Sequence, residues 1–106
     1  MPDTPVIRVQ DPLPPVLPRK AKGLEVAEFD TELVVLAVAE QKAHHLQGLA
    51  AIVFDACDGR TRSNELALEV AEATGGDVQH ALDEIAEVWR TFVRVGLVEG
   101  QVPRRR

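Results

Sequence analysis

Four side chains have a chemistry that a catalytic or metal site could use: the thiol of Cys57 and the imidazoles of His44, His45 and His80. A thiol beside an imidazole can become an activated nucleophile, but no glycine-rich loop that could hold an oxyanion accompanies Cys57. Adjacent histidines on a strand point to opposite faces, so His44 and His45 are poorly placed to chelate one metal ion. A free cysteine on the core side of a helix is typical of a small buried hydrophobe. We therefore expect no catalytic residue, no metal ligand and no cofactor, and hence no enzyme.

The chain begins with a proline-rich segment. Six of its seven prolines lie in residues 1–22, which end in the basic cluster Arg19-Lys20-Ala21-Lys22. Proline fixes φ and lacks an N–H, so we expect a flexible arm here; an arm that docks on a partner is the alternative. We expect residues 23–100 to form the folded domain and residues 101–106 a basic tail. Removing residues 1–18 and 104–106 should then leave the fold intact.

Strand-like patterns follow directly after the arm. Leu24–Phe29 is a short candidate strand, and Leu33–Ala39 is apolar at every position and rich in β-branched residues, which is typical of a central strand. Ala43–Gln47 is the third candidate. We predict an antiparallel meander with the second strand in the middle and the third strand at an edge. Because only one face of the sheet can lie on helices, the proline arm, a second copy of the chain or a partner enzyme should cover the other face.

Local signals mark two helices after the sheet. The first is predicted to run from Leu49 to Cys57 and to end at Asp58-Gly59, where glycine allows a positive φ. The second is predicted to start near Thr61 or Ser63, because either hydroxyl can cap it. Gly75-Gly76 should end the second helix.

A third helix is predicted from the Asp77 cap to Val95, with Gly96 as its stop. It carries an apolar stripe at helical spacing, made of Val78, Leu82, Ile85, Trp89, Phe92 and Val93. A second row, Ala81, Val88 and Val95, repeats every seven residues and flanks the stripe on one side. Either a small domain buries this wide apolar face entirely, or the second row lines a groove for a partner's apolar side chains.

The arrangement of the three helices suggests a helix-turn-helix, but the charge does not suit DNA. Residues 23–100 carry 15 acidic and 5 basic side chains. The third helix, which would enter the DNA groove, has Asp77, Asp83, Glu84 and Glu87 against two arginines, so phosphate would be repelled. No apolar stretch reaches the roughly 20 residues that span a bilayer. We expect no nucleic acid, no membrane and a cytoplasmic location.

The runs "HHLQGLAAIVFDACDG" and "NELALEVAEATGGDVQHALDEIAEVWRTFVRVGLVEG" resemble the PqqD family, the small peptide chaperones also called RiPP recognition elements. Five places in the family's pattern carry this resemblance, which extends over residues 24–99. They are filled here by Leu46-Gln47, Ala50-Ala51, Cys57-Asp58-Gly59, Glu65-Leu66 and Gly96-Leu97. The resemblance implies an α+β, winged helix-turn-helix-like fold, with a three-stranded antiparallel sheet followed by three helices.

The resemblance also implies a role. Family members bind the leader segment of a ribosomally made precursor peptide as an added strand, and present the peptide to a modifying enzyme such as a radical or cyclising enzyme. The expected peptide-binding residues lie on the third strand and the third helix: Ala43, His44, His45, Leu46, Gln47, Ala81, Glu84, Ile85, Val88, Phe92 and Val95. The alternatives are a winged-helix DNA-binding regulator and a structural subunit of a larger complex, and a homodimer stays open.

Overall fold

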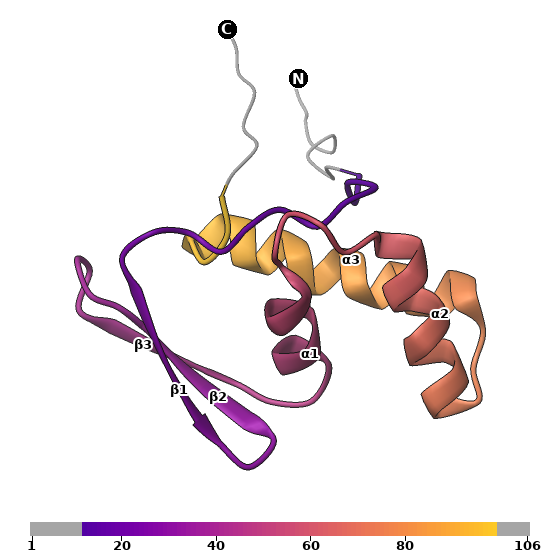
Figure 1. Cartoon of the computed structure of the whole chain (residues 1–106), viewed down its shortest axis with the longest axis horizontal. Helices are drawn as coiled ribbons and strands as arrows, with labels where there is room; N and C mark the ends of the chain where they lie inside the picture. Colours follow the sequence, from indigo (N-terminus) through magenta and orange to yellow (C-terminus); the bar gives the residue numbers. More distant parts are fainter. Residues whose placement is uncertain (1–11, 100–106) are drawn as a thin grey trace, which may run out of the picture.

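The computed structural model describes residues 12–99, which form three strands followed by three helices (Figure 1). The elements are β1 Leu24–Phe29, β2 Glu32–Ala37, β3 Lys42–Leu46, α1 Leu49–Ala56, α2 Ser63–Thr74 and α3 Val78–Val95. The predicted α+β class and the order of the elements are confirmed. Within residues 12–99, no helix combines the length and apolar character needed to cross a membrane.

The sheet is an antiparallel meander in which β2 lies between β1 and β3, as predicted. β2 ends earlier than predicted, at Ala37, because Val38 and Ala39 belong to the turn that leads into β3. Gln41 in this turn has a φ of 56°, so it takes the left-handed conformation that glycine would otherwise supply. Buried and half-buried residues alternate along β2, so one of its faces packs on the helices.

The two faces of the sheet have different surroundings. Leu33 and Val35 point to the helices and are buried, whereas the other face carries half-buried Val34 and Leu36 and the largely exposed Phe29. In Figure 1 the sheet projects from the helices like a wing. Residues 12–22 do not cover its outer face, because they run along the helices before they enter β1 (Figure 1).

Residues 12–22 contradict the prediction of a flexible arm. Leu17 is completely buried in the core. The Leu17 N–H donates to the Thr61 carbonyl at 2.9 Å, and the Leu17 carbonyl accepts from the Gly59 N–H at 3.0 Å. Further along, the Ala21 N–H donates to the Leu97 carbonyl at 3.0 Å. This segment is therefore part of the fold; the rest of the predicted arm (1–11) and the basic tail 101–106 lie outside the described residues.

The turn between α1 and α2 is built on Asp58. Its carboxylate accepts the backbone N–H groups of Thr61 and Arg60, each at 2.8 Å, and the Thr61 hydroxyl at 3.0 Å. The bonds from Thr61 and Arg60 hold the pKa of Asp58 below its ordinary value. The predicted cap at Thr61 or Ser63 is wrong: Arg62 occupies the cap position without a side-chain bond, and the Ser63 hydroxyl donates to the Pro14 carbonyl.

Both ends of α3 follow the prediction. The Asp77 side chain accepts the His80 N–H at 3.2 Å, and Gly96 ends the helix with a φ of 79°. Between them, Ile85, Trp89 and Phe92 are buried. The amphipathic stripe thus seats α3 against the rest of the core.

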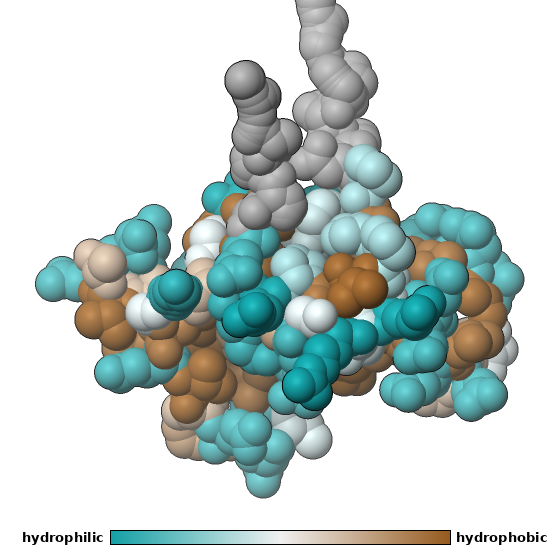
Figure 2. Space-filling view, turned by 45° about the horizontal axis from the view of Figure 1, so that its top comes forward, coloured by the Kyte–Doolittle hydropathy of each residue, from teal (hydrophilic) through white to brown (hydrophobic). Residues whose placement is uncertain are grey.

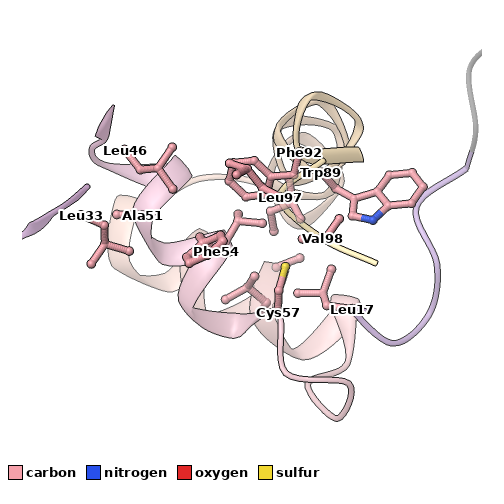
Figure 3. Close-up of a cluster of buried hydrophobic side chains, with 14 of the residues drawn as sticks. Leu17, Leu33, Leu46, Ala51, Phe54, Cys57, Trp89, Phe92, Leu97 and Val98 are labelled. Atoms are coloured by element: carbon pink, nitrogen blue, oxygen red, sulfur yellow. The ribbon is translucent and has the colours of Figure 1, made fainter. Parts of the chain in front are cut away.

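The core joins all parts of the fold (Figure 3). The rings of Phe54 and Phe92 meet edge to face, with centroids 5.8 Å apart. Leu17 belongs to the same core and lies beside Cys57 and Val98 (Figure 3). Cys57 is 1% exposed, and burial raises the pKa of its thiol to about 12, so the thiol is a buried hydrophobe as predicted.

Candidate functional site

β3 is one of the two edge strands of the sheet, with β1 at the other edge. β3 pairs with β2 through Lys42–Leu46, and within residues 12–99 no strand pairs with its other edge. Every second residue of an edge strand directs its N–H and C=O away from the sheet. This edge is therefore able to hydrogen-bond an added strand.

The register of β3 divides the predicted strand residues between two faces. His44 lies opposite Val35 and Leu46 opposite Leu33, so both are on the face that meets the helices. Leu46 is buried, whereas His44 is half-buried. On this face, His44 is thus the predicted strand residue that keeps an accessible side chain.

The remaining predicted strand residues do not face the helices. Ala43 and His45 are exposed on the outer face, opposite Leu36 and Val34. The His45 Nε2 lies 2.7 Å from a Glu32 carboxylate oxygen. Gln47 lies beyond the end of β3 and is exposed. The histidine pair is therefore split between the faces, as the alternation along a strand requires.

The second row of α3 is not uniform. Ala81 is 3% exposed and belongs to the core, contrary to the prediction that it lines a groove. Val88 is half-buried against the core, and Val95 is 41% exposed. Of the other predicted helix residues, Ile85 and Phe92 are fully buried core residues, and Glu84 is exposed. The accessible apolar surface on this side of α3 thus begins at Val88.

A shallow hollow of about 390 Å³ lies beside Val88. It is lined by Glu87, Val88, Arg90, Thr91 and Arg94. The sequence interpretation missed Thr91 and Arg94, although Glu84, Val88, Thr91 and Val95 follow one another at helical spacing on one side of α3. That spacing was the signal that could have found Thr91.

The charges along α3 are ordered. Asp83, Glu84 and Glu87 come before Arg90 and Arg94 along the helix. Within the described residues, no group of three or more His, Cys, Asp or Glu side chains is placed to hold a metal ion. The arrangement provides hydrogen bonds, apolar contacts and charge, which are the means of recognising a peptide.

Comparison with known proteins gives two matches. The family model described as "Coenzyme PQQ synthesis protein D (PqqD)" matches residues 32–98. A solved structure described as "TbiB1 in Complex with the TbiA(beta) Leader Peptide" has the same fold, with a TM-score of 0.71 at 15% sequence identity. That likeness covers 80% of this chain and 99% of the other. No curated protein matches the chain.

Proposed function

Because this chain belongs to the PqqD family, we propose that it is a non-catalytic adaptor that binds the leader segment of a ribosomally made precursor peptide. The observation that carries the proposal is the open edge of β3, which can accept the leader as a fourth strand. Strand addition gives affinity through backbone hydrogen bonds and selectivity through alternate side chains. The similar TbiB1 structure is described in complex with a leader peptide, which supports a leader peptide as the ligand.

Apolar side chains of the leader contact α3 in this proposal. Val88 and Val95 supply the accessible apolar surface, and the buried Leu46, Ile85 and Phe92 support it from below. Ordering a flexible segment costs about 2–5 kcal/mol, so tight binding needs several apolar contacts in addition to the strand pairing. In this proposal the half-buried His44 of β3 and the exposed Glu84 of α3 add polar selectivity.

The adaptor role requires a second protein. The chain holds the leader while a peptide-modifying enzyme acts on the rest of the precursor, whose local concentration at the enzyme rises as a result. Radical and cyclising enzymes are the classes that the PqqD family suggests. We place this role in the cytoplasm, where a lone cysteine such as Cys57 stays reduced.

The test is a leader titration with charge substitutions on α3. The ligand is a fluorescein-labelled leader from a short precursor gene sought next to the gene of this chain, and anisotropy reports its affinity. Val88→Glu should weaken binding about tenfold or more, or about 1.4 kcal/mol, because a carboxylate opposes apolar contacts. Val95→Glu should act in the same direction, and circular dichroism should show that both variants stay folded.

Leu68→Glu is the matched control, because Leu68 is an apolar residue of α2 that is 50% exposed. It should bind the leader as the parent protein does. Equal affinity of the parent, Val88→Glu and Val95→Glu proteins would move the binding site away from α3. Failure of the labelled leader to bind the parent protein at all would contradict the function itself.

A further inference from the structure

Five of the eight Lys and Arg side chains in residues 12–99 lie on three short chain segments. Three chain segments, residues 16–22, 58–62 and 97–99, carry five basic side chains and two acidic ones. The rest of residues 12–99 carries three basic and thirteen acidic side chains. A protein this acidic would gain most by spreading its few cations among its carboxylates, so their concentration on three segments calls for an explanation.

Backbone hydrogen bonds hold these three segments side by side. Residues 16–22 lie in the middle: Val16 pairs with Arg62 on one side, and Lys20 pairs with Val98 on the other. The Glu99 N–H donates to the Arg19 carbonyl at 2.9 Å, and the Ser63 N–H donates to the Pro15 carbonyl at 2.9 Å. Residues far apart in the sequence thus bring their cations onto three adjacent segments, which together we call the basic frame.

Four cations of the basic frame have no carboxylate partner among the described residues: Arg19, Lys22, Arg60 and Arg62. All four side chains belong to exposed residues. The carboxylate of Asp58, which lies within the frame, is occupied by Thr61 and the Arg60 N–H. Figure 2 turns this side of the molecule toward the reader and shows strongly hydrophilic side chains below the two grey chain ends.

Lys20 is the exception within the frame, because its ammonium group is already engaged. Its Nζ donates to the Cys57 carbonyl at 3.0 Å and lies 5.2 Å from the centre of the Phe54 ring. Lys20 therefore anchors residues 16–22 to α1. The other four cations are free to meet a ligand.

We propose that the basic frame is a docking surface for an acidic, extended segment of a partner protein. Residues 16–22 span about 20 Å as an extended chain. Over that length duplex DNA presents about a dozen phosphate charges and continues beyond both ends, where the acidic remainder of this chain repels it. A short run of Asp and Glu ends where the frame ends, so it gains the attraction without the repulsion.

This docking surface is separate from the proposed leader site. The frame consists of residues before β1, between α1 and α2, and after α3, whereas the leader site uses β3 and one side of α3. The two sites can therefore be occupied together. An acidic partner held at the frame would leave the β3 edge open for a leader.

The test uses a fluorescein-labelled octaglutamate peptide and the whole chain. The double variant Arg60→Glu/Arg62→Glu removes two frame cations and keeps the Asp58 turn, which uses backbone atoms at position 60. The control double variant Lys42→Glu/Arg94→Glu makes the same change in net charge on β3 and α3. Anisotropy should show salt-dependent binding that the frame variant loses about tenfold or more and the control variant keeps within about threefold.

Lys22→Gln/Arg62→Gln is a milder second variant that should also weaken binding of the octaglutamate peptide. Circular dichroism should show that each variant stays folded. Equal losses in frame and control variants would mean that only net charge matters, and would overturn the proposal. So would a short duplex DNA or phosphatidylserine vesicles that bind the frame as tightly as the peptide. Leader affinity should stay unchanged in the frame variants, so a failure here is distinct from a failure of the leader site.

Discussion

Among single residues, Cys57 makes the stability of the fold depend on pH. Burial raises the pKa of its thiol from about 9 to about 12 in the folded protein. Between these values the unfolded chain loses a proton that the folded chain keeps. The free energy of unfolding therefore falls as pH rises above about 9, by at most about 1.4 kcal/mol per pH unit from this group.

Urea denaturation from pH 8 to pH 10 measures this effect. Cys57→Ala is the control protein. Lysines titrate in both proteins, so the difference between their pH profiles reports the thiol alone. The parent protein should show the steeper fall in stability, and its native thiol should react slowly with a disulfide reagent. Parallel pH profiles for the two proteins would contradict the burial of the thiol.

At the scale of elements, residues 12–22 behave as a fixed strap. Leu17 is fully buried, so Leu17→Ala should lower the free energy of unfolding by about 2–5 kcal/mol through lost contacts and a cavity. Val16→Ala is the matched control, because Val16 is 38% exposed and should cost much less. Urea denaturation of the three proteins checks this. Equal stability of the Leu17→Ala and parent proteins would contradict the burial of Leu17 and support the flexible arm predicted from the sequence.

Elements with local signals could be predicted from the sequence. β1 and α3 have the predicted bounds. For α3 the reason is local, because Asp77 caps the helix and Gly96 ends it through contacts within a few residues. β3 could be predicted at the sheet edge, because strands joined by short turns pair with their neighbours in the sequence, which places the second strand in the middle. These features depend on neighbours in the sequence, which pattern reasoning can see.

Features that depend on distant residues could not be predicted. Leu17 sits among prolines without any periodicity, and its burial requires Thr61 and Gly59, which the fold brings to it. Ser63 has the residue type of a helix cap, but its hydroxyl donates to the carbonyl of Pro14 in the same strap. Ala81 lies at the spacing of an accessible row, yet it is buried. The candidate site was therefore predicted by element but not fully by residue.

At the scale of the whole molecule, leader binding should stabilise the fold, because the β3 edge and α3 exist together only in the folded state. A leader at a hundred times its Kd should raise the free energy of unfolding by about 2.7 kcal/mol. Thermal denaturation with and without the leader measures this. A scrambled leader is the control, and an equal shift with it would mean that the binding is not selective.

The pairing of Lys20 with Val98 has a consequence for how the protein is made. Residues 16–22 lie between two segments of the domain that are synthesised later, and the second of these contains Val98. At about 5–20 residues per second, the interval between Lys20 and Val98 takes roughly 4–16 s to translate. Leu17 and Val98 belong to the same core, so the environment that buries Leu17 is complete only after Val98 has been synthesised.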